Sequence, residues 1–356
     1  MRRVAQVVQH LQPGGIETIV LDLARLGASA DEVHVISLEG RPETILANWP
    51  RAGELSGRLH GMDKQPGVAP RLLMDLRRLF KRLNIDIVHT HHIGPLIYGG
   101  VAARLAGIRH VVHTEHDAWH LAGRRRRMVE RLALSLARPA LAADADIVAD
   151  ALRRAIPGCR PTVIWNGIDT DRFLPGDQHA ARAALGLPLE GPIIGTAARL
   201  ETVKGVDRLI EAFARLDTPA TLAIAGSGSE LANLTAQVTA LGLDGRVNFL
   251  GRVDTMPRFY QALDVFCLAS RHEGLPLSLL EAQASGVRAV ALDVGGVRDA
   301  LCPSTGYLIK DGDEAGLTTA LDQAISLPCL TDPRDFVVAS RNITAMVRGY
   351  DQLYAA

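Results

Sequence analysis

The sequence lacks the long apolar run that a membrane-spanning helix needs. No apolar stretch among its 356 residues approaches about eighteen residues. The first residues, MRRVAQVVQHL, pass from two arginines directly into a strand-like pattern without a cleavage site of small residues. They do not have the pattern of a secretory signal. We therefore expect a protein that works in the cytoplasm.

Cysteine is scarce and dispersed. Cys159, Cys267, Cys302 and Cys329 have no close partner along the chain, which favours buried free thiols over a disulfide framework or a zinc site. Apolar residues make up 47% of the chain and charged residues 22%, as in globular proteins. The length suits two domains that each bury a core.

The chain also lacks a net charge, but its charges are unevenly distributed. Residues 1–175 contain 24 Lys and Arg against 18 Asp and Glu, and residues 176–356 contain the remaining 15 against 21. This asymmetry favours either closure of the two halves or attraction of the basic half to an anionic acceptor or membrane surface. The sequence does not choose between these alternatives.

Two common phosphate-binding signatures are absent. No Walker lysine follows the glycine pair at Gly14 and Gly15, and Leu231 breaks a G-x-G-x-x-G pattern that begins at Gly226. We therefore expect neither a P-loop nor a nicotinamide site.

Short apolar strands alternate with amphipathic helices, which is typical of doubly wound parallel sheets. Strands are predicted at 4–9, 32–38, 85–89, 109–114, 145–149, 162–165, 193–197, 221–225, 246–250, 264–269, 288–292 and 305–309. Helices are predicted at 16–26, 72–83, 124–141, 204–216, 276–286, 313–327 and 335–354. A polar segment with Pro and Gly after Asn166 predicts a domain boundary near residue 170.

The segment 264–296 contains the densest functional signals. Pro276 fits the first turn of a helix that follows a strand and a polar loop. Free amides at such a helix start bind phosphate or sugar oxygens. Glu273 precedes this helix and Glu281 lies in its second turn. Each carboxylate alone is typical of a solvated surface, so only the combination points to a site.

A second signal lies between the strand at 193–197 and the next helix. Arg199 and Lys204 lie five residues apart, at a strand end and a helix start. Arg offers a planar fork and Lys a point charge, so the two can hold one diphosphate from two sides.

Histidines gather after two strands of the first half. His89 and His91 share a strand face and, with His113 or His116 as a third ligand, form one hypothesis for a zinc site. The alternative is that these histidines form hydrogen bonds at the strand ends. The second alternative is the more common in proteins, and we adopt it.

These motifs together resemble glycosyltransferase family 4 (group 1), whose members are retaining nucleotide-sugar enzymes of the GT-B fold. EGLPLSLLEA resembles the family's Glu-x7-Glu motif, and ARLETVKG resembles its R-x-x-x-x-K-G element. GGIE, HTEHDAW and NGID are similar to further family segments. The resemblance covers nearly the whole chain and is densest from 199 to 296.

The resemblance implies two Rossmann-like, doubly wound parallel-sheet domains facing across a cleft. Residues 1–170 would form the acceptor-side domain, with the C-terminal helix 335–356 packing back onto it, and residues 171–334 the nucleotide-sugar domain.

The resemblance also implies roles for individual residues. It matches the family's catalytic positions to His116, which Asp117 would orient, and to Glu273. The other implied contacts are Gly15, Arg199, Lys204, Leu277 and Ser278 for the donor diphosphate, Glu273, Gly274, Leu275 and Pro276 for the sugar, Glu281 for the ribose, and Arg252 and Val253 beside the base. Asp299 replaces a glutamate that many members have, so its role stays open.

The implied activity is transfer of a sugar from a nucleotide diphosphate sugar to a hydroxyl with retention, without a metal or other cofactor. UDP is the commonest donor nucleotide in the family, and the acceptor would be a carbohydrate or lipid-linked glycan of a bacterial polysaccharide or glycoconjugate. Arg124–Arg127, which lead an amphipathic helix, predict contact with an anionic membrane. Nucleic acid is not expected as a partner. The alternatives are a catalytically silent relative that binds carbohydrate or a partner, and a phosphorylase or epimerase.

Overall fold

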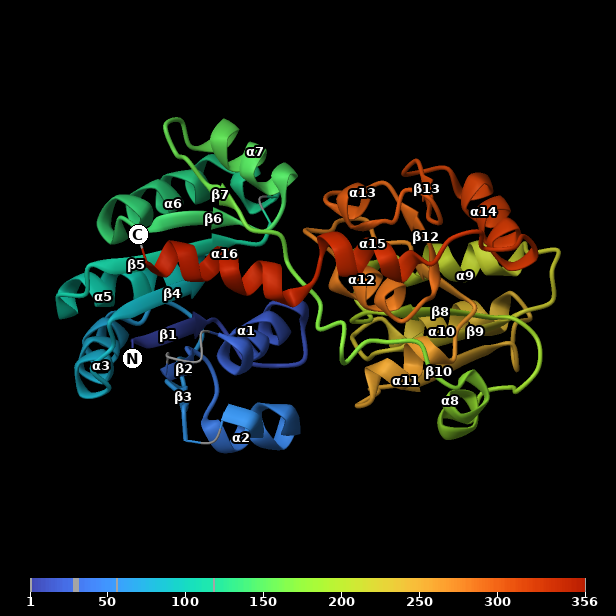
Figure 1. Cartoon of the computed structure of the whole chain (residues 1–356), viewed down its shortest axis with the longest axis horizontal. Helices are drawn as coiled ribbons and strands as arrows, with labels where there is room; N and C mark the ends of the chain where they lie inside the picture. Colours follow the sequence, from blue (N-terminus) through green and yellow to red (C-terminus); the bar gives the residue numbers. More distant parts are fainter. Residues whose placement is uncertain (1, 28–31, 56, 118, 356) are drawn as a thin grey trace. The chain divides into compact units, whose positions relative to one another are not determined.

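The chain folds into two compact units, each built around one parallel sheet (Figure 1). The computed structural model describes residues 2–27, 32–55, 57–117 and 119–355. The first unit comprises Met1–Gly167 and Ile343–Ala356, and the second comprises Ile168–Asn342. The doubly wound α/β architecture predicted from the alternation of strands and helices is confirmed in both units.

The first unit contains a seven-stranded sheet in the order β3-β2-β1-β4-β5-β6-β7. Its strands are β1 (Arg3–Val8), β2 (Glu32–Ser37), β3 (Leu59–Gly61), β4 (Ile87–His91), β5 (His110–Glu115), β6 (Ala140–Ala143) and β7 (Thr162–Val163). Its helices and helical turns are α1 (Gly15–Leu26), α2 (Pro42–Asn48), η1 (Pro50–Leu55), α3 (Pro70–Arg82), α4 (Ile93–Pro95), η2 (Leu96–Gly100), α5 (Val101–Ala106), η3 (Trp119–Ala122), α6 (Arg124–Ala137), α7 (Asp146–Ala155) and α16 (Ile343–Ala355).

Alternate residues of the central strands face opposite sides of this sheet. Val7 and Val88 pack with Leu76 and Phe80 of α3 and with alanines of α5. The other face meets α16, where Tyr350 and Tyr354 contact the ring of His89. Because side chains alternate along a strand, β4 and β5 send one set of polar groups toward α16 and another set to the opposite face.

The second unit contains a six-stranded sheet in the order β10-β9-β8-β11-β12-β13. Its strands are β8 (Ile193–Ala197), β9 (Thr221–Ala225), β10 (Val247–Gly251), β11 (Val265–Leu268), β12 (Arg288–Leu292) and β13 (Tyr307–Ile309). Its helices and helical turns are α8 (Gln178–Leu185), η4 (Thr202–Lys204), α9 (Val206–Ala214), α10 (Leu231–Ala240), α11 (Met256–Gln261), α12 (Leu277–Ala284), α13 (Val297–Ala300), α14 (Glu314–Ser326) and α15 (Pro333–Ser340).

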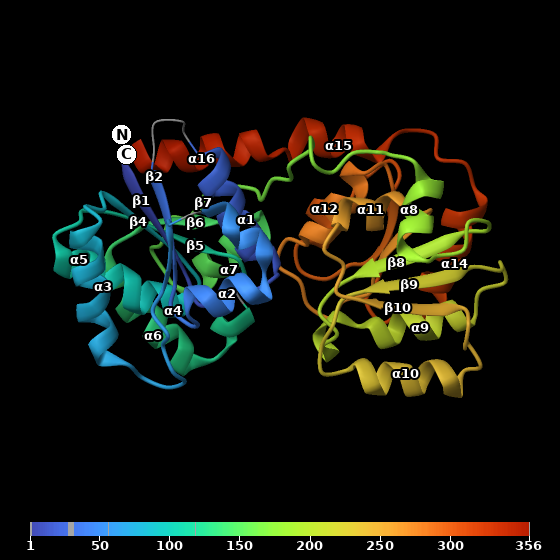
Figure 2. The ribbon, with the colours of Figure 1, turned by 90° about the horizontal axis from the view of Figure 1, so that it is seen from below.

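Helices cover both faces of the second sheet. Figure 2 shows α9 and α10 on one side and α8, α11 and α12 on the other. Leu209, Phe213 and Leu234 pack against strand residues such as Ile224 and Val265 in one buried cluster. The strand at 264–269, the helix at 276–286 and the strand at 288–292 are confirmed as β11, α12 and β12.

Three predictions about elements were wrong. The segment predicted as a strand at 145–149 begins helix α7, and β6 at Ala140–Ala143 ends the predicted helix at 124–141 early. This alanine-rich stretch has no periodicity that separates helix from strand, and the pairing of β6 between β5 and β7 decides it.

The last predicted helix, at 335–356, is interrupted. Helix α15 ends at Ser340 and α16 begins at Ile343, while Ala356 lies outside the described residues. At the interruption the amide of Ile168 donates to the carbonyl oxygen of Arg341 at 2.8 Å, so this oxygen is bonded outside the helix.

The four cysteines are free, as predicted, although Cys159 is half-buried and Cys329 is exposed. Among the described residues, no helix combines the length and apolar character needed to cross a membrane.

Candidate active site

The predicted donor residues of the second unit lie at one edge of its sheet. Arg199 follows β8, Lys204 ends the turn η4, and Glu273 lies in the loop between β11 and α12. The carboxyl ends of parallel strands share an edge, and ligands of doubly wound sheets bind there. The chain therefore brings together residues that are 69 positions apart, such as Lys204 and Glu273.

Lys204 and Glu273 form the central ion pair of this edge. The Lys204 ammonium lies 2.8 and 2.9 Å from the two carboxylate oxygens, and the Ser270 hydroxyl donates to the same carboxylate at 2.6 Å. The Glu273 side chain is only 8% exposed and that of Lys204 is 22% exposed. The Glu273 carboxylate thus accepts three hydrogen bonds from two groups, while Lys204 still reaches solvent.

Two glycines let the backbone crowd around this pair. Gly205 has φ +61°, and a Cβ there would lie 2.0 Å from the carbonyl oxygen of Ala269. Gly295 has φ +54°, and a Cβ there would lie 1.8 Å from the carbonyl oxygen of Glu273. No other residue type fits either position without moving the loop that carries Glu273.

Helix α12 presents its first amides beside this loop. Pro276 precedes the helix with φ −76°, and its side chain caps none of the first helix amides. These amides include those of Leu277 and Ser278. The carbonyl of Gly274 accepts from the amide of Gly296 at 2.9 Å. The structure thus places the predicted segment 274–278 at a helix start suited to an anion.

Glu281 lies on α12, one turn beyond this start. The hydroxyl of Tyr260 donates to Glu281 Oε2 at 2.6 Å. Burial, with the nearby Glu281 charge, raises the pKa of Tyr260 well above its usual value, so the tyrosine remains a donor. The sequence interpretation missed Tyr260, because an aromatic residue on a short helix carries no signal that it contacts a carboxylate 21 positions away.

The remaining predicted donor residues are less enclosed. Arg199 is exposed, and Arg252 is exposed after β10 with its Nε 3.2 Å from Asp254 Oδ1. Val253 is half-buried beside it. In the first unit, Gly15 is exposed at the first position of α1.

His89 and His91 share a face, as predicted, and their ring centroids lie 4.2 Å apart. Their ring nitrogens form the hydrogen bonds that the adopted alternative expects. The ring nitrogens of His89 lie 2.8 Å from the hydroxyls of Tyr354 and Thr114, and those of His91 lie 2.8 Å from Gln6 and 3.0 Å from His116. Burial lowers the pKa of both histidines well below the usual value, so they are neutral hydrogen-bonding groups.

His116 is oriented by a residue other than the one predicted. Its Nδ1 lies 3.2 Å from Asp144 Oδ2, a residue that follows the end of the neighbouring strand β6. The amide of Asn166 donates to the same oxygen of Asp144 at 2.8 Å. Burial raises the pKa of the Asp144 carboxyl. The sequence interpretation missed Asp144, since only the pairing of β5 with β6 brings it beside His116.

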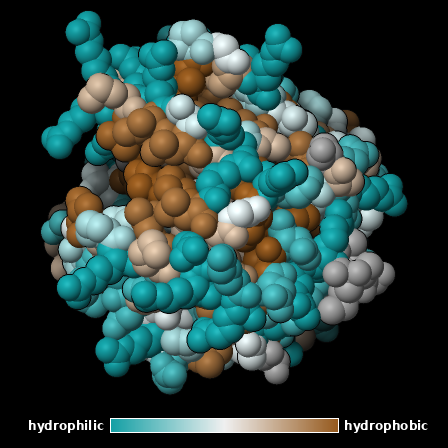
Figure 3. Space-filling model, turned by 90° about the vertical axis from the view of Figure 1, so that its left-hand side faces the viewer, coloured by the Kyte–Doolittle hydropathy of each residue, from teal (hydrophilic) through white to brown (hydrophobic). Residues whose placement is uncertain are grey.

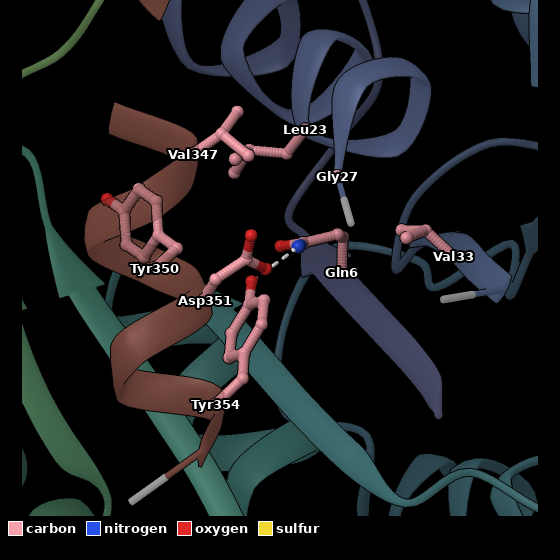
Figure 4. Close-up of a pocket in the computed structure, with 8 residues that line it drawn as sticks. All are labelled: Gln6, Leu23, Gly27, Val33, Val347, Tyr350, Asp351 and Tyr354. Carbon is pink, nitrogen blue, oxygen red and sulfur yellow. Dashed lines mark hydrogen bonds between the residues drawn. The ribbon is translucent and has the colours of Figure 1, made fainter. Parts of the chain in front are cut away.

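The histidine network adjoins a small pocket between α1 and α16 (Figure 4). Gln6 donates to the Tyr354 hydroxyl at 2.9 Å at its floor. Leu23, Val33 and Val347 supply apolar walls. The pocket is built from the first unit alone, so it is separate from the ion pair of Lys204 and Glu273.

Family comparisons agree with this arrangement of two units. The family model "Glycosyl transferases group 1" matches residues 177–342, and "Glycosyltransferase Family 4" matches residues 13–172. These two ranges cover the residues around Glu273 and around His116, respectively.

Curated relatives match mainly part of the chain. A D-inositol 3-phosphate glycosyltransferase of Mycobacterium sp. (strain JLS) is 39% identical over 178 residues, which is 47% of this chain and 40% of the relative. The lipopolysaccharide core biosynthesis mannosyltransferase LpsB of Rhizobium meliloti (strain 1021) is 37% identical over 171 residues, 45% of this chain and 46% of the relative. The chain thus aligns with less than half of the length of either relative.

Solved structures match along the whole chain. Anabaena HepE, solved in complex with UDP and glucose, superposes with a TM-score of 0.83 at 22% identity over 100% of both chains. This likeness concerns the fold. The chain belongs to the group 1 glycosyltransferases of glycosyltransferase family 4 and has the GT-B fold of two parallel-sheet domains.

Proposed function

We propose that this chain is a retaining glycosyltransferase that moves a sugar from a nucleotide diphosphate sugar, with UDP as the nucleotide, to a hydroxyl group. The observation that carries the proposal is the ion pair of Lys204 and Glu273 at the start of α12. A cation, a buried carboxylate and free helix amides at one sheet edge suit a leaving diphosphate joined to a sugar.

In this proposal the protein stabilises the departing diphosphate without a metal or other cofactor. Lys204 and Arg199 neutralise its charge, and the amides of Leu277 and Ser278 donate to its oxygens. Gly15 leaves room for the diphosphate in the first unit. Lys204 then exchanges one carboxylate contact for a phosphate contact when the donor binds.

The sugar hydroxyls are held by Glu273 and by the backbone of the segment 274–276. His116 contributes from the first unit by exchanging its hydrogen bond with His91 for one to a sugar hydroxyl. Retention follows from front-side displacement, in which the leaving phosphate accepts the proton of the acceptor hydroxyl. Retaining hydrolases instead use a carboxylate nucleophile about 5 Å from an acid, and we assign no such pair here.

The nucleoside is recognised beyond the diphosphate. Glu281, oriented by Tyr260, accepts from the ribose hydroxyls, and Arg252 and Val253 lie beside the base. UDP is favoured as the nucleotide because HepE, which has this fold, was solved with UDP and glucose. The acceptor is a carbohydrate or lipid-linked glycan, since the curated relatives carry names that refer to inositol 3-phosphate and to the lipopolysaccharide core.

Peripheral contact with an anionic membrane at the cytoplasmic face is part of the proposal. Helix α6 buries Ala133 and Ala137 and exposes Met128, Leu132 and Leu136, which are 66%, 60% and 52% exposed. The exposed three are spaced by four residues and form one stripe. Figure 3 shows apolar side chains gathered on the side of the first unit where α5 and α6 lie.

The charges at the start of α6 support the same contact. Arg124, Arg125 and Arg126 are exposed at the positive end of the helix dipole, where cations do not stabilise a helix. An exposed apolar stripe beside arginines fits the interface of an anionic bilayer.

The membrane contact is tested by sedimentation with lipid vesicles. Vesicles of phosphatidylglycerol should carry the protein down at low salt, and vesicles of phosphatidylcholine should not. Leu132→Ser should reduce binding, and Leu241→Ser, on the other unit, should not. Equal binding by both variants would contradict the contact.

The donor assignment is tested by thermal shift with UDP, GDP, ADP and their sugar conjugates in the absence of divalent metal. A nucleotide at a hundred times its Kd should stabilise the wild type by about 2.7 kcal/mol. Glu281→Ala should lose most of this effect, and the exposed control Glu190→Gln should retain it. Stabilisation by no nucleotide would favour the alternative of a catalytically silent carbohydrate- or partner-binding protein.

Turnover is tested with the nucleotide sugar identified in this way. Release of UDP only in the presence of a separate acceptor would exclude an epimerase, and nuclear magnetic resonance of the product would give the anomeric configuration. A product with inverted configuration would refute the retaining mechanism.

A further inference from the structure

Three buried side chains of metal-binding type meet on the face of the first sheet opposite α16. His113 and Glu115 lie two residues apart on β5 and therefore share a face, and Glu130 reaches them from α6. All three side chains are 0% exposed. One ligand atom from each lies within 4.8 Å of the other two. Such a group differs from a surface acidic cluster because water does not reach it.

Distances place the histidine between the two carboxylates. His113 Nε2 lies 2.9 Å from Glu115 Oε2 and 3.7 Å from Glu130 Oε1. Ligand atoms at about 2.0–2.2 Å from a tetrahedral zinc ion are about 3.4 Å apart. The two observed distances lie on either side of this value, so small side-chain movements would admit an ion.

The other ring nitrogen of His113 is held from the side away from the carboxylates. His113 Nδ1 lies 2.9 Å from the Thr90 hydroxyl and 3.1 Å from the Thr90 backbone oxygen. These contacts fix the ring so that Nε2 points toward Glu115 and Glu130. A ring nitrogen held at a backbone carbonyl is also the usual support of a metal-binding histidine.

We propose that His113, Glu115 and Glu130 bind one divalent first-row transition metal ion, for which Zn²⁺ is the probe. One imidazole and two carboxylates are nitrogen and oxygen ligands that suit this class of ion. His92 Nδ1 lies 3.7 Å from the other oxygen of Glu115, beside the open side of the group. The site shares His113 with the zinc hypothesis drawn from the sequence, but it includes neither His89 nor His91, which lie on the other face of the sheet.

The ion would have a structural role. It would join α6 to the end of β5, and His116 follows Glu115 directly. Binding therefore would fix the strand end from which His116 projects, without touching the sugar or the diphosphate.

Metal content and stability test the site on the full chain, produced without a polyhistidine tag. The protein is dialysed against a chelator, reconstituted with Zn²⁺ and passed through gel filtration before its zinc is measured. We expect one zinc per chain and a rise of the Tm by several degrees on reconstitution. Glu130→Gln, which keeps the shape but removes the charge, should weaken zinc binding at least about tenfold. Glu17→Gln, at a buried carboxylate 3.3 Å from His10, is the matched control and should bind zinc like the wild type.

A second measurement avoids dependence on the folding of one variant. Co²⁺ bound to the wild type should give a visible absorption band of low-symmetry coordination, which Zn²⁺ should displace. Absence of stoichiometric zinc and of the cobalt band in the wild type would overturn the proposal. Retention of zinc by Glu130→Gln, or equal loss in both variants, would also overturn it.

Discussion

The ion pair of Lys204 and Glu273 allows stability and nucleotide binding to be separated. Lys204→Met leaves the Glu273 carboxylate, which is 8% exposed, with Ser270 as its remaining side-chain donor. Breaking a fully buried pair costs 3–5 kcal/mol, and the partial exposure of Lys204 lowers our expectation to about 2–3 kcal/mol. In a unit of this size that corresponds to a fall in Tm of roughly 5–10 °C.

The opposite substitution should cost less. In Glu273→Gln the amide oxygen still accepts from Lys204, whose ammonium also reaches water, so we expect a loss of about 1–2 kcal/mol. Both variants are measured by urea unfolding and by thermal melting. The control is Arg271→Met, which breaks the more exposed pair of Arg271 with Asp207, and it should cost less than about 1 kcal/mol.

Nucleotide binding should separate the two variants. Lys204→Met removes a charge-assisted contact to the diphosphate, so UDP should bind about 10- to 100-fold more weakly. Glu273→Gln removes the carboxylate that competes for Lys204, so UDP should bind as in the wild type or more tightly, while sugar transfer is lost. Isothermal titration gives both affinities. Equal weakening of UDP binding by Glu273→Gln and Lys204→Met would refute the exchange of partners by Lys204.

Three further changes test other parts of the structure. Tyr260→Phe removes the 2.6 Å hydrogen bond to Glu281 and should weaken the binding of UDP roughly tenfold. The binding of a UDP analogue that lacks the ribose hydroxyls should not change. An equal effect on both ligands would argue against the ribose contact. Gly205→Ala should lower the free energy of unfolding by at least about 2 kcal/mol in urea, because a Cβ there meets a backbone oxygen at 2.0 Å. Gly242 also has a positive φ but lies in open space, so Gly242→Ala should lower it by about 1 kcal/mol. Burial lowers the pKa of His60 to about 4, so the unfolded chain binds the proton more readily than the folded chain. The free energy of unfolding should therefore fall as the pH drops from about 6.5 toward 4. His60→Asn should flatten this pH dependence, and an unchanged pH dependence would contradict the role of His60.

The sequence determined the elements and the chemical type of the site in the second unit. Apolar runs and helical periodicity located β8, β9, β11 and β12, because buried parallel strands are apolar throughout. These elements place the loop of the segment 264–296 between a strand and a helix. This loop contains the glycine, Pro276 and charged residues that point to the site. Their place at the sheet edge follows from chain direction alone.

Only the tertiary structure decided the partners of these side chains. Lys204 meets Glu273, Tyr260 meets Glu281, and Asp144 meets His116, across 69, 21 and 28 positions of sequence. Such pairs depend on which strands are neighbours in the sheet, and local periodicity carries no information about strand order.

Helix α6 gives the clearest case of this limit. The sequence predicts an amphipathic helix here, yet the fold buries Glu130 and two alanines, half-buries Leu134 and leaves Leu132 and Leu136 exposed. Periodicity identifies two faces of a helix, and ordinarily the apolar one is buried. Here close packing against the sheet accepts only small side chains and one carboxylate that meets His113. The sequence by itself therefore determined that a helix with two faces forms, while the shape and charge of the surface beneath it decided which face turned inward.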